Sequence, residues 1–245
     1  MDLGIAGKVA LVTAASKGLG FGVAQALARE GAKVAITSRS RERIDAAAAT
    51  IGAVGFTHDA RDVDAGQELV HDVEARLGPI EILVTNSGGP PANPDALAFE
   101  RNDWQAAYET LVLAQITLIR AVMPGMRERG WGRVLSLSST MAREPGPVLV
   151  LSSGHRAGLL AALKVIARQV AADGVTVNSL LPGLIATDRV IELGSGSPDR
   201  VAEIPAKRLG TVVEFAAAAA FLCSAQASYV TGTALRVDGG ATRSV

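Results

Sequence analysis

The sequence predicts an α/β fold in which a doubly wound parallel sheet forms a single domain. Short β-rich runs alternate with amphipathic stretches of helical length along the whole chain. The β-rich runs are apolar throughout, which is typical of parallel strands covered on both faces. Right-handed crossovers between such strands place helices on both faces of one sheet. No linker, repeat or low-complexity segment divides the 245 residues, so we expect one domain over 1–245.

The elements follow one another in a regular order. Strands are predicted at 8–14, 33–39, 55–59, 80–89, 132–139, 174–183 and 234–240. Helices are predicted at 18–31, 41–52, 66–78, 102–126, 152–173 and 211–224. Residues 188–207 interrupt the alternation and contain the run Gly-Ser-Gly-Ser-Pro. Because an insert beyond the carboxyl end of a strand commonly covers a substrate, we expect a lid at 188–207.

Composition excludes several classes of partner. Lys plus Arg and Asp plus Glu both number 24, so the chain lacks the basic surface that nucleic acid or an anionic membrane attracts. No run of about 18 uninterrupted apolar residues indicates a membrane span. The N-terminus lacks an export-signal pattern, and the single Cys223 fits a reducing compartment. We expect a cytoplasmic protein with no nucleic-acid partner, no membrane partner and no bound metal.

Residues 12–20, Val-Thr-Ala-Ala-Ser-Lys-Gly-Leu-Gly, follow the first strand and open the first helix. Gly18 and Gly20 allow the backbone to approach a pyrophosphate, and the helix N-terminus offers free N–H groups to the anion. Ala14 stands where the first glycine of such a loop is usual, and we expect the turn to survive this change. The stretch predicts a dinucleotide site.

The end of the second strand predicts which dinucleotide binds. NAD sites of this kind carry an acidic residue about 20 residues past the loop, whereas this chain has Ser38 and Arg39 there. A guanidinium suits a 2′-phosphate, and Lys17 adds a second positive charge. NADP is therefore predicted in preference to NAD. The alternative is that Arg39 and Arg41 are solvated charges at a strand end.

Further motifs in the right order resemble the short-chain dehydrogenase/reductase family, in particular its 3-oxoacyl-carrier-protein reductase-like members, over essentially the whole chain. The motifs are the loop 13–20, Asp59, Thr-Asn-Ser-Gly at 85–88, the serine strand 132–139, the Pro-Gly segment 181–187 and the C-terminal signature 229–240. The resemblance implies a Rossmann-type oxidoreductase with a small-molecule substrate, usually tetrameric. The cofactor contacts that it implies are Thr13, Ser16, Lys17, Gly18, Leu19, Gly20, Ser38, Arg39, Asp59, Ala60, Asn86, Gly88, Arg156, Pro182, Gly183, Ile185 and Thr187.

The catalytic positions depart from this family, which uses an Asn, a Ser and a Tyr-x-x-x-Lys pair. The serine is present as Ser139, but Leu111 occupies the Asn place. Ser152 stands at the tyrosine place and Arg156 at the lysine place. A shifted alignment does not restore the pair, because the tyrosines of this chain, Tyr108 and Tyr229, are followed four residues later by Val112 and Thr233.

These substitutions alter the acid/base chemistry. Loss of a positioned general acid typically costs about 10²- to 10⁴-fold in rate. Ser139 and Ser152 can hydrogen-bond a carbonyl oxygen while water brings the proton, and Arg156 can stabilise negative charge without donating a proton. His155 is an alternative proton source, or else a surface or interface histidine. We expect Ser139, Ser152 and Arg156 to be the catalytic residues.

Three functions follow from these observations. The first is an NADP-dependent reductase or dehydrogenase of an apolar carbonyl or alcohol with an atypical acid/base group, since Met141, Val148, Leu149, Leu184 and Val190 suggest an apolar pocket. The second is a non-catalytic NADP-binding sensor or partner subunit. The third is a lyase resembling halohydrin dehalogenases, which carry arginine at the lysine place but keep the tyrosine. Dimer or tetramer formation through the long helices 101–123 and 152–172 is expected from the resemblance.

Overall fold

The computed structural model describes residues 2–192, 194 and 196–244. Within these residues, seven parallel strands form one sheet in the order β3-β2-β1-β4-β5-β6-β7. Their bounds are β1 Val9–Val12, β2 Lys33–Ser38, β3 Val54–Thr57, β4 Ile80–Thr85, β5 Gly132–Leu137, β6 Val175–Pro182 and β7 Ala234–Val237. The chain runs outward from β1 to β3 and returns to β4 beside β1. This order confirms the doubly wound, Rossmann-type sheet in a single domain.

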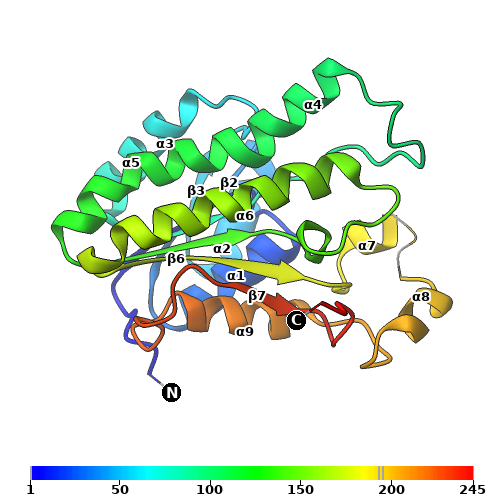
Figure 1. Ribbon diagram of the computed structural model, residues 1–245. Helices are drawn as coiled ribbons and strands as arrows, with labels where there is room; N and C mark the ends of the chain where they lie inside the picture. Colours follow the sequence, from blue (N-terminus) through cyan, green and yellow to red (C-terminus); the bar gives the residue numbers. More distant parts are fainter. Residues whose placement is uncertain (1, 193, 195, 245) are drawn as a thin grey trace.

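Helices cover both faces of the sheet (Figure 1). One face carries α1 (Gly18–Arg29), α2 (Arg41–Ile51) and α9 (Val212–Leu222), whose apolar sides share one core. The other face carries α3 (Ala65–Leu77), α4 (Arg101–Tyr108), α5 (Ala114–Glu128) and α6 (Val150–Val170). Two short helices, α7 (Asp188–Glu192) and α8 (Pro198–Glu203), lie beyond the carboxyl end of β6.

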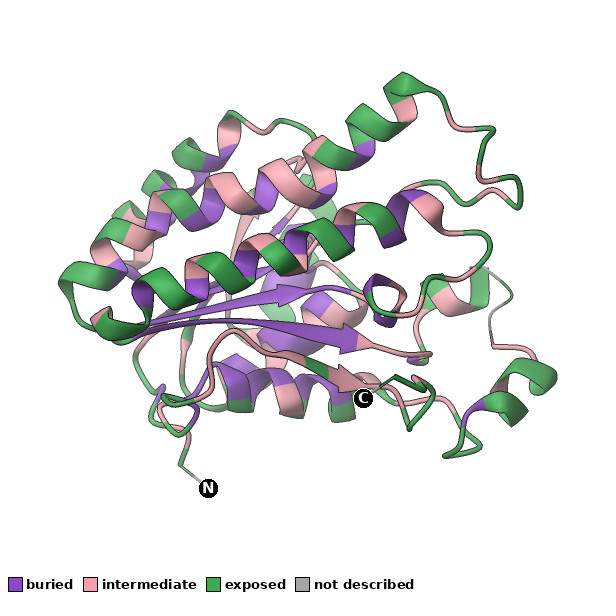
Figure 2. Ribbon diagram, viewed as in Figure 1, coloured by how far each residue is buried: buried purple, intermediate pink, exposed green. Residues whose placement is uncertain are grey.

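Burial follows this layering (Figure 2). Every residue of β1 and β5 is buried, which explains why the sequence shows continuous apolar runs instead of alternation. The outward sides of α4 and α6 are exposed. Polar side chains relevant to function therefore gather where the strands end rather than along the sheet.

The helical run Arg101–Glu128 has the length and apolar composition of a membrane-crossing helix. Its apolar side nevertheless packs on the sheet, where Leu118, Val122 and Met126 are buried in the core. A core helix satisfies the same length and composition criteria, so we interpret this run as part of the fold.

The structure adds detail to the third strand and to the segment predicted as a lid. The third strand ends at Thr57 rather than Asp59, because the Asp59 carboxylate accepts a hydrogen bond from the Arg61 backbone N–H (3.1 Å) and turns the chain. The segment predicted as a lid, 188–207, contains α7 and α8, while its positions 193 and 195 lie outside the described residues.

Candidate active site

The junction between β1 and α1 has the shape of an anion cradle. Helix α1 begins at Gly18, and Lys17 before it is extended with no side-chain cap, so the first-turn amides have no side-chain partner. A Cβ added at Gly18 would meet nothing within 4 Å, whereas one at Gly20 would lie 2.8 Å from the Ala14 carbonyl oxygen. Gly18 therefore faces open space, and Gly20 lets the helix pack against the loop.

Ala14 adopts the left-handed conformation that the usual glycine would favour, with φ of 47°. Its N–H donates to Thr37 Oγ1 (3.2 Å), and its carbonyl accepts from Asn86 Nδ2 (3.1 Å). These two bonds hold the turn in spite of the Cβ. The expected survival of the turn matches this geometry.

The loop after β4 forms the other wall of the crevice. Thr13 Oγ1 donates to the Asn86 carbonyl (2.7 Å) and accepts from the Asn86 N–H (2.8 Å), which ties the end of β1 to the end of β4. An added Cβ at Gly88 would meet nothing within 4 Å. Because the strand order reverses between β1 and β4, this crevice lies at the topological switch point, where open α/β sheets bind ligands.

The end of β2 presents a free cation. Arg39 is exposed and has no ion pair within the described residues, whereas Arg41 pairs with Asp45 (2.9 Å). Asp59 receives the Arg61 guanidinium (2.5 Å), and this hydrogen bond holds the pKa of the Asp59 carboxyl below its usual value. Asp59 is therefore paired with Arg61, whereas Arg39, whose charge also helps to lower the pKa of Asp59, forms no ion pair among the described residues.

Backbone hydrogen bonds tie the segment after β6 to neighbouring parts of the chain. Gly183 N–H donates to the Val237 carbonyl (3.0 Å). Ile185 bridges Gly210, but the bridge uses the Leu184 carbonyl and the Ala186 N–H. The N–H and carbonyl of Ile185 itself are therefore not used by the bridge.

The residues at the altered positions meet at the N-terminal half of α6. Ser152 and Arg156 are both buried and lie one helical turn apart. Arg156 Nε donates to Ser152 Oγ (3.2 Å), and Arg156 Nη1 donates to the Leu137 carbonyl at the end of β5 (3.0 Å). Two residues further along, Ser139 Oγ accepts from the Met141 N–H (3.2 Å) in a 3₁₀ turn that packs against α6. The structure thus brings all three predicted catalytic residues to one corner.

Arg156 is a buried cation without an acidic partner in the described part of the chain. Its exposed fraction is 6%, and burial lowers the pKa of its guanidinium to about 10. At neutral pH it stays charged. Two of its five N–H groups have a partner, so three remain for a ligand.

The position at which the family has Asn is apolar and buried. Leu111 is fully buried beside Ala107 and Leu151, and it sits within a π-helical turn, Glu109–Leu113, between α4 and α5. Gln115 stabilises this turn, since its Nε2 donates to the Leu111 carbonyl (3.0 Å) and its Oε1 accepts from hydroxyls on β4 and β5. No polar side chain therefore replaces the Asn at this position.

His155 points toward α4. Its ring lies 5.5 Å from the Trp104 ring and 6.2 Å from the Tyr108 ring. Its Nδ1 lies 2.8 Å from the Leu151 carbonyl, which only accepts, so Nδ1 carries the hydrogen. This packing fits the helix-surface alternative for His155 and not the proton source.

The segment 188–207 touches both walls of the crevice. Lys17 Nζ lies 3.0 Å from Asp188 Oδ2 and 4.0 Å from Glu192 Oε1, both on α7. On the opposite wall, the Arg189 guanidinium lies 3.5 Å from the position of a Cβ at Gly89. Helix α7 therefore spans the crevice in the structure.

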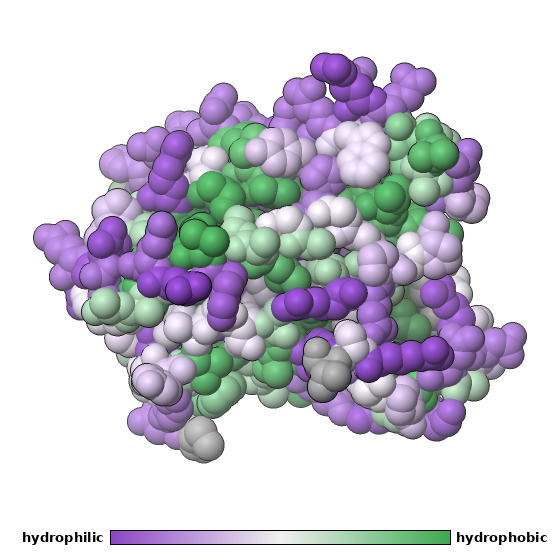
Figure 3. Space-filling view, in the orientation of Figure 1, coloured by the Kyte–Doolittle hydropathy of each residue, from purple (hydrophilic) through white to green (hydrophobic). Residues whose placement is uncertain are grey.

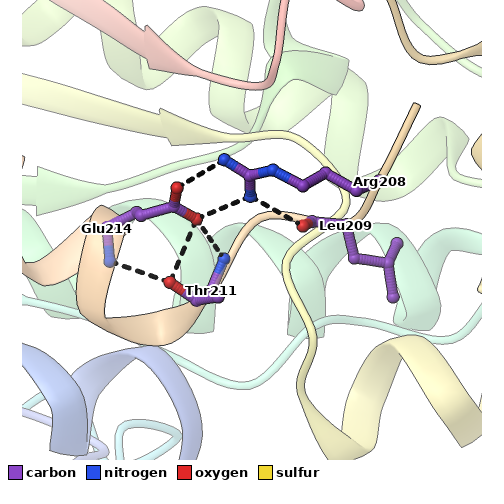
Figure 4. Close-up of polar contacts among 4 residues, drawn as sticks. All are labelled: Arg208, Leu209, Thr211 and Glu214. Atoms are coloured by element: carbon purple, nitrogen blue, oxygen red, sulfur yellow. Dashed lines mark hydrogen bonds and ion pairs between the residues drawn. The ribbon is translucent and has the colours of Figure 1, made fainter. Parts of the chain in front are cut away.

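Figure 4 shows how the far end of this segment is anchored. Arg208 Nη2 and Glu214 Oε1 are 2.6 Å apart, and Glu214 also accepts from the Thr211 N–H (2.8 Å) in the capping box of α9. The Arg208 hydrogen bond holds the pKa of the Glu214 carboxyl at about 2. The segment thus leaves and rejoins the body at fixed points.

A separate cavity of about 460 Å³ lies between α6 and the strands β6 and β7. Arg143, Lys164 and Thr233 contribute to its lining. None of the predicted site residues lines it, so it is distinct from the crevice.

Three features of this site were missed from the sequence. The π-helical turn and Gln115 carry no residue signal distinct from a regular amphipathic helix. The pairing of Lys17 with α7 joins residues 171 positions apart. Only the acidic residues at 188 and 192, one turn apart, offered a hint that a cation faces them.

This arrangement defines a dinucleotide-binding α/β protein, and comparison with known proteins specifies its family. A family model described as enoyl-(acyl carrier protein) reductase matches residues 13–242. The 3-oxoacyl-(acyl-carrier-protein) reductase FabG of Escherichia coli (strain K12) is 35% identical over 237 residues, which cover 96% of this chain and 97% of that protein.

Solved structures agree with the sequence comparison. L-sorbose reductase from Gluconobacter frateurii, in complex with NADPH and L-sorbose, has a TM-score of 0.94 at 31% identity and covers 100% of both chains. YwfH, an NADPH-dependent reductase involved in bacilysin biosynthesis, has a TM-score of 0.93 at 29% identity and covers 97% of this chain and 99% of its own. The chain belongs to the short-chain dehydrogenase/reductase family of oxidoreductases.

Proposed function

We propose that the protein is an NADP-dependent oxidoreductase that transfers hydride between nicotinamide and an apolar carbonyl or alcohol, with an atypical acid/base group. The observation that carries this proposal is the buried Arg156, which has three unused N–H donors beside Ser152 and Ser139. Burying a guanidinium without an acidic partner is costly unless a ligand uses it.

The crevice fits a dinucleotide. The uncapped start of α1 and the open space over Gly18 and Gly88 suit the pyrophosphate and ribose. The unpaired Arg39 suits a 2′-phosphate, in agreement with the NADPH named in the structures of two relatives. The remaining contacts are those expected from the family motifs: Thr13, Ser16, Lys17, Leu19, Gly20, Ser38, Asp59, Ala60, Asn86, Pro182, Gly183, Ile185 and Thr187.

The chain's own residues position the reacting groups. A nicotinamide bound here supplies or accepts hydride. Arg156 holds Ser152 in place through its Nε and offers its free N–H groups to the ribose hydroxyls. Ser139 and Ser152 orient the substrate oxygen, and the partly exposed apolar side chains of Met141 and Leu149 line the approach.

Residues 188–207 act as the lid of this site. The pairing of Lys17 with Asp188 and the contact of Arg189 at Gly89 connect α7 to both walls of the crevice. Substrate and cofactor then enter beneath α7, while the Arg208–Glu214 pair fixes the C-terminal end of the lid segment.

A homo-oligomer formed through the face of α4, α5 and α6 is part of the proposal. Figure 3 shows apolar side chains on this face between polar ones. Trp104, Tyr108 and Val165 are exposed there, and burying them against a second copy would remove apolar area from water. Size-exclusion chromatography with light scattering should give a dimer or tetramer, and a monomer would contradict this part.

The test is a fluorescence titration with NADPH and NADH, followed by turnover measurements across a panel of apolar carbonyls and alcohols. We expect NADPH to bind more tightly than NADH and one class of compound to turn over. NADPH binding without turnover would favour the non-catalytic sensor or partner subunit. Absence of binding would overturn the proposal.

A further inference from the structure

The cavity between α6 and the edge of the sheet, called the side cavity from here on, is separate from the cofactor crevice. Its volume of about 460 Å³ lies within the range of about 300–1,000 Å³ that small-molecule sites occupy. Helix α6 forms one wall, and β6 and the edge strand β7 form the other (Figure 1). Because none of the predicted cofactor or catalytic residues lines it, a ligand in the crevice does not fill it.

The charge in the side cavity has one sign. Among the described residues, its lining contains two cations, Arg143 and Lys164, and no Asp or Glu. Neither cation has an ion pair in the described part of the chain. Lys164 Nζ donates to the Gly232 carbonyl (3.0 Å), which leaves its other N–H groups for a ligand. Two unpaired cations that face one cavity favour an anionic ligand.

Two hydroxyls add polar groups near Lys164. Ser179 on β6 lines the cavity and is only 2% exposed, and its Oγ has no hydrogen-bond partner within the described residues. Thr233 lies beside it, since the Ser179 N–H donates to the Thr233 carbonyl (2.9 Å). Thr233 Oγ1 likewise has no partner among the residues that the structure describes. Because a buried hydroxyl without a partner is unfavourable, Ser179 indicates a polar ligand atom at this end.

The two cations come from opposite ends of the side cavity. Arg143 follows the 3₁₀ turn at Thr140–Ala142 beyond the carboxyl end of β5, whereas Lys164 contacts Gly232 before the start of β7. From Ala157 to Lys164, the α6 wall is about 10 Å long at the helical rise of about 1.5 Å per residue. Apolar side chains line the space between the two ends: Ala157, Leu160, Ala161, Val177 and Ala234.

We propose that the side cavity is a binding site for an elongated organic dianion, in particular a linear dicarboxylate. One carboxylate contacts Lys164, Ser179 and Thr233, and the other contacts Arg143. The carbon chain between them lies against the apolar side chains. Both carboxylates are charged at neutral pH, so the ligand neutralises both cations. This site is independent of the proposed function, since neither the cofactor nor the crevice takes part in it.

Isothermal titration calorimetry of the full chain at low salt tests the site. The probes are the dicarboxylates succinate, adipate and suberate, and octanoate, which matches the length of suberate but carries one carboxylate. We expect suberate to bind about three- to tenfold more tightly than succinate or octanoate, because only a long dianion reaches both cations. Added salt should lower the affinity for suberate, since it screens the charges.

Variants locate the bound dicarboxylate. Lys164→Met and Ser179→Ala should each lower the affinity for suberate about three- to tenfold, and Arg143→Met about threefold. Ala161→Phe places a ring in the cavity without removing a charge and should abolish binding. Lys33→Met, at an exposed lysine at the start of β2, should leave the affinity unchanged and is the matched control. Circular dichroism and light scattering show whether each variant keeps its fold and oligomeric state.

Several results would overturn this inference. The first is no binding of any dicarboxylate at millimolar concentration, which is also expected if a second copy of the chain covers the side cavity. The second is suberate binding no more tightly than octanoate. The third is an affinity for suberate that is unchanged in Lys164→Met and Ala161→Phe. The last is displacement of suberate by NADPH, because suberate would then occupy the crevice. NADPH binding is titrated separately, so failure of the proposed function is distinguishable from failure of this site.

Discussion

Replacement of Arg156 by methionine should stabilise the cofactor-free protein while it damages the site. Burial lowers the pKa of this guanidinium from its ordinary value to about 10, which corresponds to about 3 kcal/mol of desolvation cost at 1.36 kcal/mol per pKa unit. Because the folded pKa lies below the unfolded value, the cost is fully present below pH 10, including at pH 7. The hydrogen bonds to Ser152 and the Leu137 carbonyl return roughly 2 kcal/mol.

The net expectation is that Arg156→Met is more stable by about 1 kcal/mol, or about 2 to 4 °C in melting temperature for a chain of this length. Replacement of a buried charge by an apolar side chain of similar size is often neutral or stabilising. Thermal unfolding followed by circular dichroism at pH 7.5 without cofactor measures the change. NADPH affinity of the same variant should fall.

Arg133 provides the matched control. It is also buried, but it donates to the carbonyls of Ser224, Gly132 and Gly174 and packs over the Trp131 ring. Arg133→Met leaves these oxygens without their donor and should lower the stability by about 2 kcal/mol. If Arg156→Met unfolds as far below the wild type as Arg133→Met, the reasoning that Arg156 is held at a cost for a ligand is wrong.

Three further predictions test the parts of the site. Arg39→Ala should lower the affinity for NADPH about 10- to 100-fold and leave the affinity for NADH nearly unchanged. Arg41→Ala, which removes a cation paired with Asp45, should change neither affinity. Equal weakening of both cofactors by Arg39→Ala would contradict the 2′-phosphate role. Asp188→Asn breaks the exposed pair with Lys17 and should speed proteolytic cleavage within 188–207 by up to about fivefold in the absence of cofactor. Asp199→Asn should leave the cleavage rate unchanged. Equal cleavage rates for the two variants would show that Lys17 does not hold α7. Glu214 has a folded pKa of about 2, below the usual 4.5, so the stabilisation it contributes is present above about pH 4.5 and is lost as the pH falls toward 2. Glu214→Gln should therefore flatten the fall in melting temperature over that range. Parallel plots of melting temperature against pH for the variant and the wild type would contradict the ion-pair account.

The sheet and its switch point could be predicted from the sequence because buried parallel strands favour short runs rich in apolar residues, and such runs alternate with helical stretches along this chain. The anion cradle could be predicted in the same way, since Gly18 and Gly20 stand shortly after an apolar strand and Gly18 begins a helix. The departures at Leu111, Ser152 and Arg156 were readable because they are single positions at fixed spacings from motifs.

Which side chains contact each other could not be predicted from the sequence. Whether His155 faces the site or α4 depends on which turn of α6 meets Trp104, and this is decided by packing between helices about 50 residues apart. The π-helical turn at Glu109–Leu113 likewise depends on Gln115 finding hydroxyls on β4 and β5. The spacing of apolar residues along these helices indicates neither outcome.

A crystal structure of the protein with NADP⁺ tests the central claim most directly. The account predicts the pyrophosphate at the start of α1 and the nicotinamide ribose against Arg156. A dinucleotide bound elsewhere would contradict it.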